Sequence, residues 1–340
     1  MGDVTAAARA ARLQTRSPNV AIVGCGLIGR KRAGALGAAR LVACADVDRD
    51  RADALARTAP GASATSDWHA AVAQSDVDVV IVSTVNNALA PVTLAAIAAG
   101  KHVLVEKPAA LTAGELDTVI DAANAAGVRV RVGFNHRYHP ALRKARELFD
   151  AGALGPMMFV RARYGHGGRP GYEKEWRADP AVAGGGELID QGVHVIDLAR
   201  WFLGDFTRVD GFAHTYVWPM PVDDNAFLLL RTAGGQAASL HVSCTEWKNL
   251  FSFEIYGAHA KLHVEGLGGS YGVERLSVYR MTPEMGPPET TIWEYPGADR
   301  SWDVEFAEFL DDIRLKRQPA AGLADARAAL RIVETIYRAA

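Results

Sequence analysis

The sequence has few cysteines and no motif that would use them. Three occur in 340 residues, Cys25, Cys44 and Cys244, and their spacing matches neither a disulfide framework nor a zinc site. The N-terminal stretch is rich in alanine and arginine and lacks the apolar segment of a secretory signal. We therefore expect reduced, buried thiols, no metal site and a cytoplasmic protein.

The chain also lacks a charge excess and long apolar runs. Its 37 Lys and Arg nearly balance 39 Asp and Glu, so the net charge of −2 gives no reason to expect nucleic acid or a membrane surface as partner. No apolar run reaches the roughly 18 residues of a membrane-spanning helix. The length suits two domains of ordinary size.

The first third of the sequence alternates strand and helix patterns. Continuous apolar runs occupy residues 19–26, 41–48, 77–84, 102–106 and 128–134, with alanine-rich helical stretches between them. Apolar strands separated by helices are typical of a parallel sheet covered on both faces. Beyond about residue 155 the pattern changes to strand-like segments joined by turns, which favours an antiparallel sheet.

These patterns predict an α/β protein with an N-terminal Rossmann dinucleotide-binding domain and a C-terminal α/β domain built on a large, open, mostly antiparallel sheet. We expect a flexible tail over residues 1–18, the Rossmann domain over 19–135 and a substrate-binding and oligomerisation domain over 136–340. The apolar spacing predicts helices over residues 187–204 and 322–340. The second helix can pack back on the first domain.

A glycine motif follows the first predicted strand. Gly24, Gly26 and Gly29 have the G-x-G-x-x-G spacing at the start of a helix, which is the context that dinucleotide binding requires. The helix N-terminus offers N–H donors to a pyrophosphate. We expect the cofactor to contact these glycines, Leu27 and Ile28 between them, and Thr84 and Asn86 at the end of the third apolar run.

Asp46 ends the second apolar run, about twenty residues past the glycines. A carboxylate there accepts both ribose hydroxyls of NAD and repels a 2′-phosphate, so we predict NAD, with NADP the weaker candidate. Arg49 and Arg51 lie close enough to soften that repulsion, and a solvated acidic residue beside Asp48 and Asp50 is the alternative.

The segment "VLVEKPAA" ends the apolar run at 102–106 with Glu106, Lys107 and Pro108. It lies where the carboxyl end of a parallel strand places ligands, and proline fixes the backbone from which Lys107 extends. We expect Glu106 to keep Lys107 charged or to orient it, and both to lie at the cofactor.

The runs "VGCGLIG", "AGKHVLVEKP", "VGFNHRYHP" and "GGGELIDQGVHVIDLARWFLG" occur in this order along nearly the whole chain. Together they resemble the glucose–fructose oxidoreductase/inositol dehydrogenase/MocA-type oxidoreductase family. The resemblance implies that Lys107 lies beside the nicotinamide and the reacting carbon. Val85 and Leu89 replace the proline and histidine common in that family, which predicts a more apolar wall on the nicotinamide side.

Asp190 and His194 lie four residues apart in the predicted helix and so share one face, with Asp197 close to it. A histidine there can take a proton from an alcohol during hydride removal, and Asp190 can hydrogen-bond a substrate hydroxyl or hold His194. The resemblance gives Asp190 and His194 these catalytic roles. We interpret Asp197 as a supporting residue, and His136 and His139 as packing or surface residues.

Three arginines are candidate substrate-binding residues. Arg137 either reaches the substrate or forms a salt bridge at the domain interface. Arg163 lies just before the glycine-rich segment 165–171 and Arg169 lies within it; this segment is either a solvated loop or a lid that binds a phosphate or carboxylate.

The predicted function is NAD(P)-dependent hydride transfer between nicotinamide and a secondary alcohol or ketone of a sugar, cyclitol or nucleotide-sugar derivative. The substrate is expected to be a small sugar or cyclitol; if the segment 165–171 is a lid, an anionic or nucleotide-linked sugar is expected. Alternatives are a sensor of NAD(H) or sugar that does not turn over, and a sugar–sugar oxidoreductase with tightly bound NADP. The apolar strands of the second domain predict a homodimer or homotetramer formed through the sheet.

Overall fold

The computed structural model describes residues 17–284 and 286–339. The chain divides into two compact units: one holds the residues up to 134 together with 302–327, and the other holds 135–301 together with the residues from 328 onward. Of the predicted N-terminal tail, residues 1–16 lie outside the described part. None of the helices described is long and apolar enough to cross a bilayer.

The first unit is built on a six-stranded parallel sheet in the order β3-β2-β1-β4-β5-β6, which is the Rossmann order. Apart from the edge strand β3, its strands are short and largely buried, as their continuous apolar sequences predict. The strands are β1 (Asn19–Val23), β2 (Arg40–Ala45), β3 (Ser63–Thr65), β4 (Val79–Val82), β5 (His102–Val105) and β6 (Val130–Val132).

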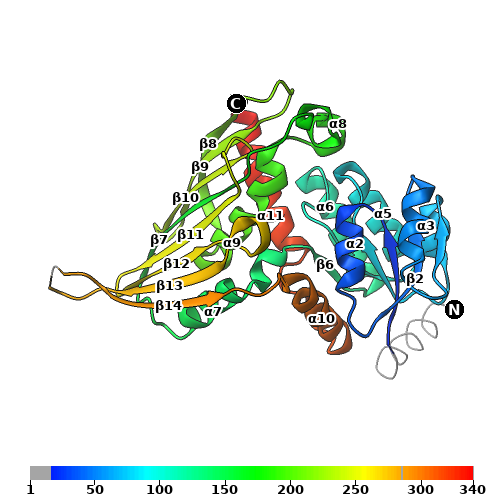
Figure 1. The fold of residues 1–340 in the computed structure, drawn as a ribbon, viewed down its shortest axis with the longest axis horizontal. Coiled ribbons are helices and arrows are strands. Elements are labelled where there is room, and N and C mark those ends of the chain that lie inside the picture. Colours follow the sequence, from blue (N-terminus) through cyan, green and yellow to red (C-terminus); the bar gives the residue numbers. More distant parts are fainter. Residues whose placement is uncertain (1–16, 285, 340) are drawn as a thin grey trace. The chain divides into compact units, whose positions relative to one another are not determined.

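Helices enclose this sheet, and one of them comes from the far end of the chain (Figure 1). They are α2 (Leu27–Gly34), α3 (Arg49–Ala56), α4 (Trp68–Ala73), α5 (Asn86–Ala98), α6 (Ala113–Ala126) and α10 (Ser301–Arg314). Phe306, Phe309 and Ile313 of α10 belong to the same buried cluster as Ile22 and Leu104. The sequence patterns did not predict α10 as an element of this core.

The second unit holds an eight-stranded sheet in the order β14-β13-β12-β11-β7-β10-β9-β8. All neighbours are antiparallel except β7 and β10. The predicted fold class is therefore confirmed. The strands are β7 (Met157–Gly165), β8 (Phe206–His214), β9 (Asn225–Thr232), β10 (Ala237–Ser243), β11 (Leu250–Gly257), β12 (Ala260–Glu265), β13 (Glu274–Arg280) and β14 (Glu289–Tyr295).

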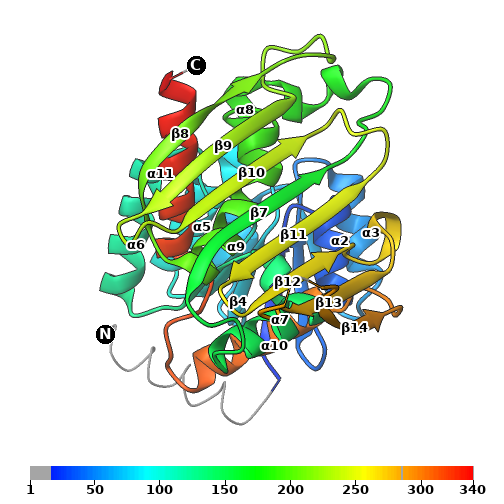
Figure 2. The ribbon, with the colours of Figure 1, turned by 90° about the vertical axis from the view of Figure 1, so that its left-hand side faces the viewer.

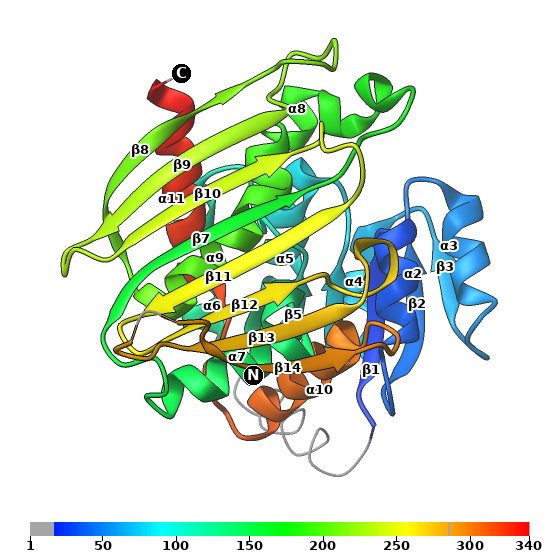
Figure 3. The same cartoon turned by 60° about the vertical axis from the view of Figure 1, so that its left-hand side comes forward.

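One face of this sheet packs against helices of the same unit, and the strands stand bare toward the viewer in Figures 2 and 3. The helices of this unit are α7 (Pro140–Asp150), α8 (Pro180–Ala183) and α9 (Val193–Leu203), and α11 (Leu323–Ala339) ends in it. Residues of β7 and β9 alternate between buried and exposed, which is the period of a sheet with one covered face.

The sequence patterns missed β3, β8 and β14. β3 has only three residues, too few for a pattern to show. β8 and β14 are edge strands, and exposed or half-exposed side chains along both remove the apolar run that marks a buried strand.

Candidate active site

The three motif glycines of the first unit have different surroundings. A Cβ on Gly24, whose φ is +94°, would lie 2.4 Å from the carbonyl oxygen of Ser83, and one on Gly29 would lie 2.0 Å from the carbonyl oxygen of Gly24. A Cβ on Gly26 would meet nothing within 4 Å. Two glycines thus permit a tight turn and close packing, while Gly26 leaves the backbone open to a ligand, as a pyrophosphate cradle requires.

Asp46 is tied to this glycine loop. Its Oδ2 accepts a hydrogen bond from the Cys25 N–H at 2.7 Å, and its Oδ1 accepts one from the Asp48 N–H at 3.0 Å. Each carboxylate oxygen has a further lone pair, so the group can still accept two ribose hydroxyls. The residues present therefore fit a dinucleotide at the place where the sequence predicts one.

The nearby arginines are already matched by carboxylates. Arg49 pairs with Asp53 at 3.1 Å and Arg51 with Asp48 at 3.1 Å. Both pairs are exposed and therefore weak, but each leaves less positive charge for a 2′-phosphate. This arrangement favours NAD at Asp46.

The cofactor-side residues after β4 divide into partly exposed and buried ones. Thr84 and Val85 are partly exposed, and the Thr84 hydroxyl donates to the Val85 carbonyl at 3.2 Å. Asn86 is buried at the start of α5, and Leu89 has no exposed surface. Leu89 thus belongs to the packed interior of the chain, and its contribution to a nicotinamide wall stays a prediction.

The Glu–Lys–Pro turn follows β5 directly. The Lys107–Pro108 peptide bond is cis, and Lys107 is partly buried. The Glu106 carboxylate accepts from Arg32 Nε at 2.7 Å inside the unit. The expectation that Glu106 orients Lys107 stays a prediction, but the structure gives Glu106 a strong partner that the sequence did not reveal.

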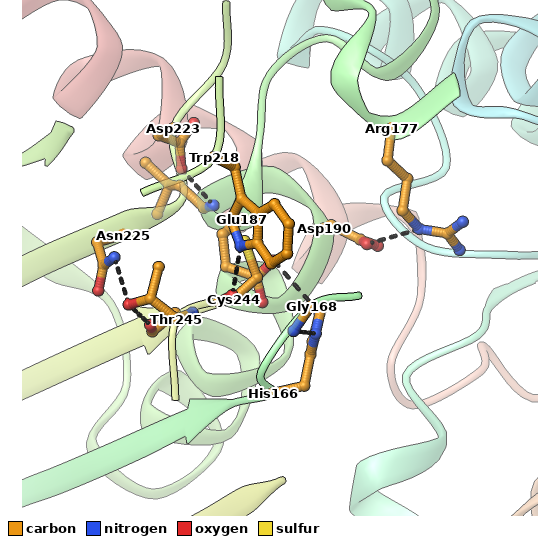
Figure 4. Close-up of polar contacts among 12 residues, drawn as sticks. His166, Gly168, Arg177, Glu187, Asp190, Trp218, Asp223, Asn225, Cys244 and Thr245 are labelled. Atoms are coloured by element: carbon orange, nitrogen blue, oxygen red, sulfur yellow. Dashed lines mark hydrogen bonds and ion pairs between the residues drawn. The ribbon is translucent and has the colours of Figure 1, made fainter. Parts of the chain in front are cut away.

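In the second unit, three glycines precede the segment that contains Asp190 and His194, and at two of them the chain approaches a neighbour closely. A Cβ on Gly185, at φ +157°, would lie 2.2 Å from the Tyr337 hydroxyl, and one on Gly186 would lie 1.9 Å from the Asp223 carbonyl oxygen. The Asp223 carboxylate accepts N–H bonds from Gly186 at 2.9 Å and Leu188 at 2.8 Å, and the Tyr337 hydroxyl at 2.7 Å. Asp223 therefore caps the start of the helix (Figure 4).

Burial raises the pKa of Asp223, and the three hydrogen bonds that it accepts oppose this rise. Asp223 was not predicted as part of the site. It lies 37 residues from Gly186 in the sequence, so no local pattern joins them.

Asp190 and His194 do not lie on one regular α-helix. Residues 188–192 form a π-helical turn, η4 (Leu188–Gly192), and α9 begins at Val193. Such turns are rare in proteins and occur frequently at functional sites. The predicted single helix over 187–204 is therefore two joined segments, with Asp190 in the first and His194 in the second.

His194 lies among aromatic rings. Its imidazole stacks on that of His136, with ring centroids 3.9 Å apart and planes 24° apart. Tyr164 of β7 meets both rings edge-on, at 5.1 Å from His136 and 6.3 Å from His194. His136 is thus a packing residue, as predicted, but the ring that it packs against is the candidate base.

Two tyrosines and Gln191 extend this polar cluster. Burial raises the pKa of Tyr164 well above the usual phenol value, so its hydroxyl stays protonated. Tyr271 interacts with the hydroxyl of Tyr164 and with the Gln191 side chain, and burial also raises the pKa of Tyr271. The cluster offers neutral hydrogen-bonding groups around the candidate base.

Asp190 has an ionic partner that the sequence did not reveal. Arg177 Nε donates to its Oδ2 at 3.0 Å, and Figure 4 shows the two side chains pointing toward each other. Arg177 also lies 3.9 Å from Glu175, which in turn binds Arg169 at 2.5 Å. Both arginines near Asp190 are therefore matched by carboxylates.

His166 and Glu187 lie at the same end of the sheet. The Gly168 N–H donates to His166 Nδ1 at 3.0 Å, which leaves the proton of the neutral ring on Nε2, and Nε2 is 3.8 Å from Glu187 Oε2. Burial lowers the pKa of His166, and the Asp190 charge opposes this. The ring is therefore neutral at pH 7. Neither residue was singled out from the sequence.

Arg137 forms a buried, forked ion pair with Asp197: its Nε is 2.8 Å from Oδ2 and its Nη2 is 2.5 Å from Oδ1. Both residues belong to the second unit, so this pair is not the predicted salt bridge at the domain interface, and the two predicted roles of Arg137 stay predictions. Asp197 thereby anchors α9 to the segment that follows the first unit, which agrees with its predicted supporting role.

Arg163 does not join the cluster. It alternates along β7 with Tyr164, whose side chain lies on the buried face that packs against α9, so Arg163 projects from the exposed face. Arg161 on that face binds Glu254 at 2.5 Å. The structure brings Tyr164, His136 and His194 together and leaves Arg163 apart, because successive strand residues point to opposite faces.

The remaining expectations concern cysteines and metals. Cys25, Cys44 and Cys244 are free and buried, as predicted. Among residues 17–284 and 286–339, no group of His, Cys, Asp and Glu has the arrangement of a metal site.

Comparisons with known proteins agree with this geometry. Residues 18–134 match the family model of the oxidoreductase family with an NAD-binding Rossmann fold, and residues 142–263 match the GFO/IDH/MocA C-terminal domain. Inositol 2-dehydrogenase of Salmonella typhimurium is 32% identical over 317 residues, 88% of this chain and 87% of that protein.

Levoglucosan dehydrogenase of Pseudarthrobacter phenanthrenivorans is 30% identical over 227 residues, 59% of this chain, and the match spans 58% of that protein's length. A solved structure of levoglucosan dehydrogenase with NADH and levoglucosan superposes with a TM-score of 0.87 at 24% identity, covering 95% of this chain and 97% of that one. The chain therefore belongs to the GFO/IDH/MocA family of oxidoreductases, whose N-terminal domain is an NAD-binding Rossmann fold.

Proposed function

We propose that the protein is an NAD-dependent dehydrogenase that oxidises a secondary alcohol of a neutral sugar or cyclitol, or catalyses the reverse reduction. The observation that carries this proposal is the capped π-helical turn that contains Asp190 and leads directly into His194, whose ring lies in a cluster of neutral hydrogen-bonding groups. The named activities of the inositol and levoglucosan dehydrogenases support the same substrate class.

The cofactor would be held by the loop of Gly24, Gly26 and Gly29 and by Asp46. When bound, nicotinamide supplies a hydride acceptor. His194 takes the proton of the alcohol as general base and returns it in the reverse direction. Asp190, whose carboxylate is bound by Arg177, either accepts a hydrogen bond from a substrate hydroxyl or holds His194 in place.

Lys107 supplies positive charge where the alcohol oxygen becomes negative as its proton leaves. The rigid Pro108 that follows it limits where the ammonium can point. Lys107, Asp190 and His194 are thus assigned as the catalytic residues.

A neutral substrate follows from the charge pattern around Asp190. Arg169 and Arg177 are both bound to carboxylates, and Glu187 adds a buried one. An anionic substrate would have to displace one of these pairs, so the lid that binds a phosphate or carboxylate is the weaker alternative.

The test is reduction of NAD, followed by the absorbance of reduced nicotinamide, with matched sets of cyclitols, free sugars, anhydrosugars and sugar phosphates. We expect turnover with a member of the neutral sets and higher kcat/KM for it than for its phosphorylated analogue. Binding of NAD and sugar without any turnover would instead favour the non-catalytic sensor.

Asp46→Ser should reverse part of the cofactor preference. Removing the carboxylate abolishes two hydroxyl acceptors and the repulsion of a 2′-phosphate, so kcat/KM should fall with NAD and rise with NADP. We expect the ratio of kcat/KM with NAD to kcat/KM with NADP to fall by roughly tenfold or more, since a hydrogen bond to a charged group is worth about 1.5–3 kcal/mol. Asp121→Ser, at an exposed residue of α6 that is remote in sequence from the glycine loop and Asp46, is the control. An unchanged ratio would remove Asp46 from the ribose site.

We also propose that the protein is cytoplasmic and forms a homodimer or homotetramer through the exposed face of its eight-stranded sheet. Phe212, Phe227, Leu229 and Phe159 are 36–55% exposed, and Phe212 stacks on Phe227 with ring centroids 5.2 Å apart. Light scattering should show an oligomer at micromolar concentration, and Leu229→Lys should dissociate it. A monomer in the wild-type protein would contradict the proposal.

A further inference from the structure

Two arginines of the first unit are completely buried, and each is paired with carboxylates of α10. Arg32 of α2 binds Glu305, and Arg131 of β6 binds Asp312 and Glu308. Both side chains are 0% exposed. A charge so deep is tolerated only with well-placed partners, so both pairs contribute to holding α10 on the sheet.

The two arginines differ in their remaining partner. Arg32 also donates from Nε to Glu106 Oε1 at 2.7 Å, while its Nη1 lies 2.5 Å from Glu305 Oε2. The Trp302 ring lies over the guanidinium, 4.4 Å from its carbon. Arg32, which belongs to α2, therefore contacts both the Glu–Lys–Pro turn and α10. These three segments are far apart in the sequence.

The side chains of Arg32 and Glu106 are tightly packed against the main chain of Gly133. A Cβ on Gly133 would lie 2.7 Å from Arg32 Nη2 and 2.9 Å from Glu106 Oε2. The main chain of Glu106 is fixed as well: its N–H donates to the Val82 carbonyl at 2.8 Å, and its carbonyl accepts from the Ala109 N–H at 2.9 Å. Both the side chain and the main chain of Glu106 are thus fixed immediately before Lys107.

We propose that Arg32, anchored by Glu305, is a positioning residue for hydride transfer: it clamps Glu106 and thereby fixes the direction in which Lys107 extends. This inference rests on the catalytic role proposed for Lys107. Arg32 itself has no exposed side-chain surface and acts only through Glu106.

Arginine suits this position because its planar fork binds two carboxylates at once, while the single ammonium of lysine cannot keep both in the same geometry. Burial raises the pKa of Glu305, and the Arg32 charge opposes that rise. The anchoring role of Glu305 rests on its contact with Arg32, whose Nη1 lies 2.5 Å from Glu305 Oε2 with no exposed surface on either side chain.

The test compares Arg32→Lys with Arg131→Lys in the full-length protein. Both substitutions keep a buried charge and disturb an ion pair with α10, but only the first touches the turn. Three quantities are measured for each: kcat, the dissociation constant of NAD, and the rate at which trinitrobenzenesulfonate modifies Lys107 in the absence of ligands, followed by peptide mass spectrometry.

We expect Arg32→Lys to lower kcat by about tenfold, because small misplacements of a catalytic group are costly, with less than about threefold change in NAD affinity. Lys107 should be modified at least about threefold faster, since a looser turn opens more often. Arg131→Lys should lower the melting temperature and leave kcat and the modification rate unchanged.

Equal effects of Arg32→Lys and Arg131→Lys on kcat and on Lys107 modification would overturn the proposal and make Arg32 a stabilising residue only. If Arg32→Lys does not fold, Glu305→Gln decides by the same readouts, with Glu308→Gln as its control. The modification rate needs no turnover, so it still reports on Arg32 if Lys107→Ala retains activity and the proposed function fails.

Discussion

Lys107→Ala should lower kcat by roughly 10²-fold or more, which is the scale of lost electrostatic or acid–base help at a reacting oxygen. NAD affinity should change much less, because the glycine loop and Asp46 carry most of the contacts proposed for the cofactor. The measurement is steady-state kinetics with the best substrate, together with the dissociation constant of NAD from a direct binding titration.

Lys101 provides a matched control six residues earlier. Its ammonium is buried and donates to the carbonyl oxygens of Gln74 at 2.6 Å and Val77 at 2.8 Å, which is a structural role. Lys101→Ala should lower the melting temperature and leave kcat of the folded enzyme near normal. If Lys107→Ala behaved like Lys101→Ala, the catalytic assignment of Lys107 would be wrong.

His194→Ala should lower kcat/KM by roughly 10²- to 10⁴-fold, the range for loss of a general base. The base acts in its neutral form, so kcat/KM of the wild type should fall as the pH decreases through the pKa of the base. That limb of the pH profile should vanish in His194→Ala. The profile of kcat/KM against pH, measured for both proteins, tests this.

Asp190→Asn separates the two roles left open for the carboxylate. A rise in KM alone would mean that Asp190 binds a substrate hydroxyl, and a fall in kcat would mean that it acts through His194. Arg163→Ala is the control, since Arg163 lies on the opposite face of β7, and it should change neither constant. Full activity in both His194→Ala and Asp190→Asn would make this helix structural.

Those parts of the site that depend on neighbouring residues could be predicted from the sequence. The turn at Gly24, Gly26 and Gly29 is local, because strand, turn and helix are consecutive; Gly24 and Gly29 are required by close backbone contacts, and Gly26 leaves the backbone open to a ligand. The place of Lys107 at the end of a parallel strand follows from the apolar run before it. In both cases the chemistry depends on spacings of a few residues.

Other parts depend on contacts between distant segments and left no sequence pattern. Arg32 meets Glu106 across 74 residues and Glu305 across 273. The π-helical turn at 188–192 looks like continuous helix in an apolar pattern, since one widened turn does not change which residues are apolar. Strand alternation predicts that Arg163 and Tyr164 point to opposite faces of the sheet. Only the position of α9 shows which of these faces carries the candidate site.

The central claim, that this chain transfers a hydride from a neutral sugar or cyclitol to NAD, is tested most directly by isotope transfer. The enzyme is incubated with NAD and with substrate deuterated at its carbinol carbons, and the reduced cofactor is analysed by mass spectrometry. We predict one deuterium per reduced nicotinamide with the wild type and almost none in the same time with His194→Ala. Tight binding of both ligands with no deuterium in the cofactor, for any substrate of the neutral sets, would contradict the account.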